Sequence, residues 1–125
     1  MTDSFKPLFW IGSSKKDLMD LPTSVIEDVG YELYLAQCGD KSPSAKPLKG
    51  FGGASVLEVI QNHDGNTFRA VYTVRFAEAI YVLHVFQKKS QRGKATPHQD
   101  MDLVRTRLAA AEERHRQWQN ERTNR

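Results

Sequence analysis

The chain has 125 residues and a mass of 14.2 kDa, which predicts a single domain over residues 1–125. Hydrophobic residues make up 39% of it and charged residues 26%, a composition that excludes collagen-like chains and wholesale disorder. No run reaches the roughly 18 apolar residues of a membrane span, and the first residues lack a secretion signal. The single cysteine, Cys38, suits a reducing compartment, so we expect a cytoplasmic protein without membrane attachment.

The first third of the chain predicts a short strand and two helices. The apolar run at 8–11 is typical of a strand. Ser13 and Ser14 then offer capping oxygens to a short helix that ends near Met19. Pro22 suits the first turn of a second helix, and Gly39 can end that helix in the left-handed conformation. The apolar stripe of this second helix consists of Val25, Val29, Leu33 and Ala36.

Residues 39–53 differ in character from the segments on either side. They are polar, and they hold the prolines and glycines that break helices and strands: Gly39, Pro43, Pro47, Gly50, Gly52 and Gly53. We therefore expect a long surface loop over about 39–53.

Beyond this loop, the hydrophobic pattern changes to the period of strands. Residues 56–60, 68–76 and 79–87 predict three strands, and the Asp-Gly pair within residues 63–66 predicts a tight turn between the first two. The third strand is apolar in both phases, which is typical of a strand that is covered on both faces.

Alternation along the second predicted strand separates its side chains into two sets. Arg69 and Arg75 fall on one face of the sheet, whereas Tyr72 falls on the other and is expected in the core. Two cations, Lys88 and Lys89, follow the neighbouring strand. The two arginines and these lysines are therefore expected to converge.

Four cations and no acid lie within residues 88–94, in a chain whose net charge is only +3. Thr96 and Gln99 have the spacing of a capping box, and Pro97 suits the first helical position. The apolar residues beyond recur at helical spacing and predict a long C-terminal helix: Met101, Val104, Leu108, Ala111 and Trp118. Residues 119–125 are polar, so we expect that end to fray.

Five segments carry a family resemblance in their order and spacing: Lys46–Gly50, Val56–Val59, Phe68–Tyr72, Tyr81–Lys89 and Thr96–Pro97. With the predicted elements around them, they resemble the RelE/ParE superfamily of bacterial toxins, and within it the HigB-like, phage-derived branch. The resemblance implies a RelE-like α+β fold. In this fold a small antiparallel sheet, the three-stranded meander plus the N-terminal strand, is packed by two N-terminal helices and a long C-terminal helix.

For function, the resemblance implies the toxin of a type II toxin–antitoxin pair. Such a toxin is an endoribonuclease, or mRNA interferase, that needs the ribosome and no metal or other cofactor, and it cuts messenger RNA in the A site. The implied catalytic residues are Arg69, Lys88 and Lys89. The implied partners are mRNA on the ribosome and an antitoxin with a helix-turn-helix DNA-binding domain. The sequence departs from the family on the first meander strand, where Glu58 and Ile60 stand at positions that often hold lysine or arginine. The residues that act as general base and general acid are not assigned.

The residues themselves are compatible with this chemistry. When a 2′-hydroxyl attacks the adjacent phosphate, the phosphorane that forms gathers negative charge, and fixed cations stabilise it. The residues expected to contact RNA or phosphate in addition to the catalytic ones are Arg75, Lys49, Arg92 and Lys94.

The acid and the histidines need separate assignments. Glu58 is either a base or a partner that holds Arg69 or Arg75, and we favour the pairing role because nearby cations lower the pKa of a carboxyl group. His84 lies inside an apolar strand and is expected to be a core histidine. The four histidines and Cys38 lack metal-ligand spacing, so no metal site is expected.

Two other functions remain open at this point. A toxin of the same fold can inhibit DNA gyrase by binding alone, and the cations at Arg69, Lys88 and Lys89 argue only weakly against this, because cations also bind partners. Alternatively, the chain is a degenerate phage-derived protein that binds its partner without catalysis.

Overall fold

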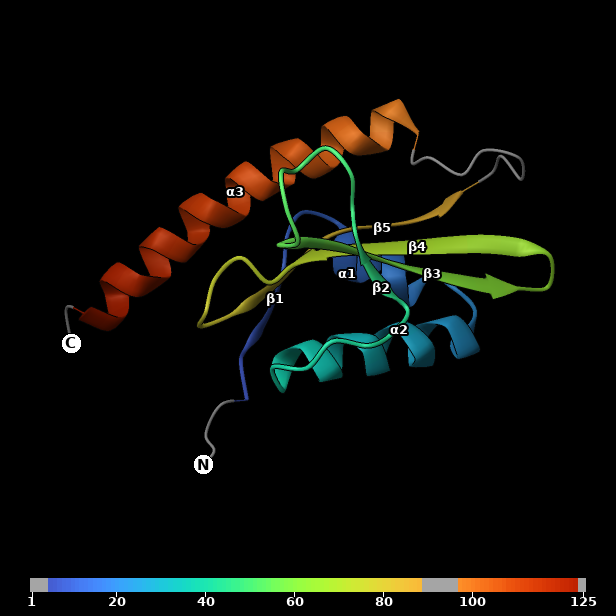
Figure 1. Ribbon diagram of the computed structural model, residues 1–125, viewed down its shortest axis with the longest axis horizontal. Coiled ribbons are helices and arrows are strands. Elements are labelled where there is room, and N and C mark those ends of the chain that lie inside the picture. The colour runs from blue at the N-terminus through green and yellow to red at the C-terminus, as the bar shows by residue number, and fades with distance from the viewer. Residues whose placement is uncertain (1–4, 89–96, 124–125) are drawn as a thin grey trace.

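The computed structural model describes residues 5–88 and 97–123. Figure 1 shows a sheet between two helical layers, with α2 along one face and α3 across the other. The elements in chain order are β1 (Leu8–Trp10), α1 (Ser14–Met19), α2 (Thr23–Gln37), β2 (Ala45–Pro47), β3 (Val56–His63), β4 (Asn66–Thr73), β5 (Ile80–Lys88) and α3 (His98–Thr123). The expected α+β class is confirmed.

The five strands form one sheet in the order β1-β5-β4-β3-β2. The expected antiparallel meander is present as β3, β4 and β5. Asp64 and Gly65 have φ values of 51° and 79°, so the predicted two-residue turn joins β3 to β4. The N-terminal strand differs from the expectation of an antiparallel sheet, because β1 pairs in parallel with β5 at the edge. Parallel strands need a long connection between them. Here two helices and three strands lie between β1 and β5 in the sequence, so the chain can return in the same direction.

The predicted loop over 39–53 is interrupted by a strand, β2, which pairs antiparallel with β3. Two contacts hold this segment against the helical layer. The hydroxyls of Ser42 and Ser44 donate hydrogen bonds of 2.8 Å to the buried Glu32 carboxylate of α2, and Ala45 packs into the core. Because β2 is an edge strand, Pro47 is tolerated within it.

Each face of the sheet has its own hydrophobic core. On the α2 side, apolar residues from α1, α2 and alternate strand positions pack together, including Tyr72, as expected. On the α3 side, the core residues are Ile11, Leu48, Val56, Val71, Ala79, Tyr81, Leu83, Val104, Leu108 and Ala111. The predicted alternation over 68–76 fails only at its end, where β4 stops at Thr73 and Phe76 packs on the α3 side.

An extra residue, Leu83, interrupts the pairing between β4 and β5. The pairs that flank it are Tyr72–Val82 and Val71–His84. Such a β-bulge shifts the side-chain alternation by one residue. Leu83 therefore faces α3, and the residues beyond it that share this face are His84, Phe86 and Lys88.

Helix α3 continues to Thr123, past Trp118, where the sequence pattern predicts fraying. The last turn is held by local contacts. The Arg122 guanidinium lies over the Trp118 ring at 4.6 Å, and the Thr123 hydroxyl donates to the Gln119 carbonyl at 2.9 Å. These contacts explain why polar residues remain helical here.

Replacing Leu83 by alanine is expected to lower the free energy of unfolding by about 2–5 kcal/mol, because the fully buried side chain leaves a cavity between the sheet and α3. Met19→Ala is the control, since Met19 is half exposed at the end of α1, and its cost is expected to stay below about 1 kcal/mol. Urea unfolding followed by circular dichroism measures both. Equal losses would contradict this packing.

Candidate active site

The predicted site residues Glu58, Arg69 and Lys88 lie on three neighbouring strands and share the α3 side of the sheet. Strand pairing sets this arrangement: Arg69 is opposite Ile60 on β3, and Lys88 is opposite Thr67 on β4. Glu58 and Lys88 are therefore the diagonal neighbours of Arg69 on either side. We call these three residues the Arg69 cluster.

Glu58 and Arg69 form a buried ion pair. The Arg69 Nη1 donates to the Glu58 Oε2 at 2.7 Å, and the two side chains are only 5% and 12% exposed, respectively. Of the two arginines considered as partners for Glu58, it is Arg69 that Glu58 contacts. In a pair this buried, removing one partner leaves an uncompensated charge and typically costs about 3–5 kcal/mol.

Lys88 adds a second cation to this buried environment and is itself only 5% exposed. Burial lowers the pKa of Lys88, and the Arg69 charge lowers it further, while Glu58 opposes the shift. A lysine in this state gives up its proton more readily than a lysine in solvent. Lys88 therefore suits both charge stabilisation and proton transfer.

Lys46 extends the row of charges onto β2 and was not among the site residues expected from sequence. It is exposed, and it is directly opposite Glu58 in the β2–β3 pairing, so the two side chains share a face. Only the register between β2 and β3 brings Lys46 to this place, and the sequence carries no signal for that register.

The other predicted cations do not join the Arg69 cluster within the described residues. Arg75 is six residues beyond Arg69, roughly 20 Å along an extended chain, and its Nη1 donates to Glu112 of α3 at 2.5 Å. Lys49 is exposed and precedes Gly50, over which the Met101 side chain of α3 lies. Lys89, Arg92 and Lys94 lie outside the described residues.

His84 joins the start of α3 to the sheet beside the Arg69 cluster. Its Nε2 is 2.6 Å from Asp100 Oδ1, and its ring stacks on Phe86 with centroids 4.5 Å apart. The residue is buried, in line with the expected core histidine, but its Nδ1 has no hydrogen-bond partner within the described part of the chain. His84 thus positions the first turn of α3, which is a role that the apolar strand pattern did not predict.

The family model described as phage derived protein Gp49-like matches residues 16–109, which is 94 of the 125 residues. The chain belongs to the Gp49-like family. The match confirms the resemblance of the sequence to the phage-derived, HigB-like branch of RelE/ParE toxins. Family membership therefore makes this a protein of the toxin type that is found in toxin–antitoxin pairs.

Among solved structures, the Gp49-like chain is similar to the toxin–antitoxin complex RelBE2 from Mycobacterium tuberculosis, with 16% sequence identity and a TM-score of 0.47. The similarity covers 71% of this chain and 98% of that chain. No curated protein matches the sequence. Within the described residues of the Gp49-like chain, no helix is long and apolar enough to span a membrane.

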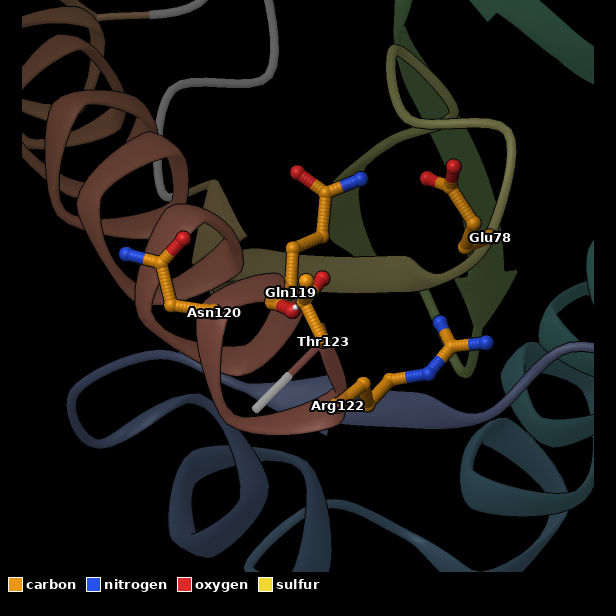
Figure 2. Close-up of a pocket in the computed structure, with 5 residues that line it drawn as sticks. All are labelled: Glu78, Gln119, Asn120, Arg122 and Thr123. Atoms are coloured by element: carbon orange, nitrogen blue, oxygen red, sulfur yellow. Dashed lines mark hydrogen bonds between the residues drawn. The ribbon is translucent and has the colours of Figure 1, made fainter. Parts of the chain in front are cut away.

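A second polar group lies at the far end of α3, around a hollow of about 590 Å³. Figure 2 shows the residues that line it, which are Glu78, Gln119, Asn120, Arg122 and Thr123. The Glu78 carboxylate is 3.0 Å from His115 Nε2, and this hydrogen bond holds the pKa of Glu78 below its usual value, with burial opposing. The other ring nitrogen of His115 is 3.1 Å from the hydroxyl of Tyr81. These contacts hold α3 to the sheet, and no predicted site residue lines the hollow.

The lowered pKa of Lys88 has a measurable effect on stability. Between its folded-state pKa and the ordinary lysine value, the folded chain binds fewer protons than the unfolded chain, so this group makes stability rise with pH. Lys88→Met is expected to remove that rise, whereas Lys46→Met, at an exposed position in the same row, is expected to keep it. Urea unfolding at a series of alkaline pH values measures the difference, and identical slopes for Lys88→Met and wild type would contradict the assignment.

Proposed function

We propose that this Gp49-like protein is the toxin of a type II toxin–antitoxin pair and cleaves messenger RNA in the ribosomal A site without a metal. The observation that supports this proposal most strongly is the Arg69 cluster, which places two cations on neighbouring strands in a chain of the Gp49-like family. Its proposed partners are mRNA on the ribosome and a helix-turn-helix antitoxin.

In the proposed reaction, the 2′-hydroxyl of one nucleotide attacks its own 3′-phosphate. The bond from phosphorus to the 5′-oxygen of the next nucleotide breaks, which leaves a 2′,3′-cyclic phosphate and a 5′-hydroxyl. The proton lost by the 2′-hydroxyl is balanced by the proton that the 5′-oxygen gains. Negative charge peaks on the phosphorane between these steps, so the enzyme gains most from cations aimed at its equatorial oxygens.

Arg69 and Lys88 have complementary tasks at that phosphorane. A guanidinium can donate two parallel hydrogen bonds to phosphate oxygens, whereas an ammonium acts as a compact charge. The lowered pKa of Lys88 also brings it nearer to the range in which a side chain transfers protons efficiently. Lys89 is proposed to assist them, and Arg75, Lys49, Arg92 and Lys94 are proposed to contact the RNA backbone.

The Arg69 cluster is closed in the free protein. Arg69 is 4% exposed and its guanidinium is held by Glu58, so a phosphate can reach it only after the side chains rearrange. We propose that docking on the ribosome supplies the binding energy for this rearrangement, with the phosphate replacing Glu58 as the anion beside Arg69. Free RNA, which lacks that docking energy, is then a poor substrate.

Loss of the cluster cations is expected to slow cleavage by about 100- to 1000-fold. Two variants remove cluster cations in different ways: Lys88→Met leaves the Arg69–Glu58 pair intact, and the double change Glu58→Gln with Arg69→Gln removes that pair as a whole. Arg116→Gln is the control, because Arg116 is an exposed arginine on α3, and it should cleave like wild type. The assay is reconstituted translation, with and without ribosomes, with message ends mapped by primer extension and folding checked by circular dichroism.

Cuts within codons that require ribosomes and nearly vanish in both cluster variants are the expected result. Cuts in free RNA at the same rate would contradict ribosome dependence. An absence of cuts by the folded wild-type protein, together with inhibition of DNA supercoiling by gyrase, would overturn the nuclease proposal.

A further inference from the structure

An exposed aromatic surface lies on the outer side of α2. Phe5 and Tyr31 are each 59% exposed and Tyr34 is 51% exposed, in a chain whose other large side chains are mostly covered. The Phe5 and Tyr34 rings are 5.8 Å apart, and those of Tyr31 and Tyr34 are 6.5 Å apart. We call these three residues, with Gly30 beside them, the α2 aromatic face. Contiguous exposed aromatic side chains of this kind are typical of sites that bind another protein.

Within residues 5–88 and 97–123, no contact explains the glycine at position 30. It lies in the middle of α2, where glycine costs about 1 kcal/mol relative to alanine. A Cβ at this position would meet no atom within 4 Å, apart from neighbouring atoms of its own helix, and Gly30 has an ordinary helical backbone. What its missing side chain does provide is room for another backbone to approach α2 closely, next to the tyrosines.

Charge distinguishes residues 17–40, which include α2, from the rest of the molecule. Residues 17–40 contain six acids and no lysine or arginine. The chain as a whole has 18 basic and 15 acidic residues, so the remainder carries 18 cations and nine acids, a formal charge of +9. Glu27 and Asp28 are the exposed acids closest in sequence to the α2 aromatic face. This surface repels nucleic acid and complements a basic partner.

The α2 aromatic face also lies away from the Arg69 cluster. Figure 1 shows α2 on the opposite side of the sheet from α3. Leu57 and Val59 point to the α2 side, whereas Glu58, between them on β3, points to the α3 side. A partner bound at the α2 aromatic face therefore leaves the cationic side of the sheet uncovered.

We infer that the α2 aromatic face is the docking surface for the antitoxin. The segment that binds there carries apolar side chains that cover Phe5, Tyr31 and Tyr34, flanked by lysines or arginines that meet Glu27 and Asp28. Its backbone comes close to α2 at Gly30. This inference rests on the proposed function for the identity of the partner, and on the aromatic, glycine and acidic residues for the location.

The probe is the protein encoded by the gene that adjoins the gene of this chain, which the proposed function takes to be the antitoxin. It is purified and titrated into the full-length chain by isothermal calorimetry. Tyr34→Ala and Gly30→Gln are each expected to weaken binding by about 10- to 100-fold, because each disturbs the centre of the surface. Gln117→Ala, at an exposed position on α3, should bind like wild type. Glu27→Lys should also weaken binding, and raising the salt concentration should weaken the wild-type complex.

Gly30→Ala separates folding from binding. It is expected to raise the melting temperature, because alanine is the better helix former and its Cβ meets no other part of the chain. The same change should weaken antitoxin binding if a backbone approaches Gly30. All these variants should retain ribosome-dependent cleavage, because none of them touches the Arg69 cluster.

Three results would overturn the inference. If the wild-type complex forms and Tyr34→Ala and Gly30→Gln bind equally well, the location is wrong, while the proposed function stands. If no complex forms although ribosome-dependent cleavage is present, the partner is wrong and the nuclease stands. If the free chain dimerises and Tyr34→Ala abolishes the dimer, the surface belongs to a second copy of the chain.

Discussion

The pairing of β3, β4 and β5 places the charged groups of this protein. Each strand alternates between the two cores, so a shift by one residue would exchange polar and apolar side chains. At Leu83, the bulge shifts the side-chain alternation of β5 by one residue. It keeps Tyr81 and Leu83 in the α3 core while turning Lys88 to the same side as Arg69. Without that extra residue, Lys88 would face α2.

Hydrophobic packing and buried charge have opposite effects on stability where the Arg69 cluster lies on β3, β4 and β5. The α3 core stabilises the region, whereas the Arg69 cluster holds two cations against one carboxylate in a largely buried place. Burial lowers the pKa of Lys88, the Arg69 charge lowers it further, and Glu58 opposes the shift. Buried clusters of charged groups are commonly found at functional sites, since apolar residues of similar volume are often at least as stabilising.

Much of this architecture follows from local patterns in the sequence. Alternation separates Arg69 from Tyr72, the Asp-Gly pair specifies the hairpin, and the stripe of α2 specifies its buried side. What the sequence does not specify is pairing between distant segments. The strand β2, its register that sets Lys46 against Glu58, and the parallel edge at β1 all depend on tertiary contacts that have no local signature.

The same limit applies to the candidate site. The sequence predicts that Arg69 and Lys88 are near each other, but it treats them as surface cations, whereas the structure buries both. It also places Arg75 with them, although the end of β4 at Thr73 and the contact with Glu112 put Arg75 elsewhere. Burial and long-range ion pairs are properties of the assembled core, so no spacing rule along one strand reveals them.

The two sides of the sheet are specialised for different partners in this account. The α3 side carries the cations proposed to meet RNA, and the α2 side carries the exposed acids Glu27 and Asp28 and the exposed aromatic residues. The most direct test of the central claim is a cryo-electron microscopy structure of the protein on a ribosome whose message has a 2′-O-methyl group at the cleavage position. The account predicts that the scissile phosphate lies within hydrogen-bond distance, about 3 Å, of both Arg69 and Lys88. A message that rests on another surface, with Arg69 still buried against Glu58, would contradict it.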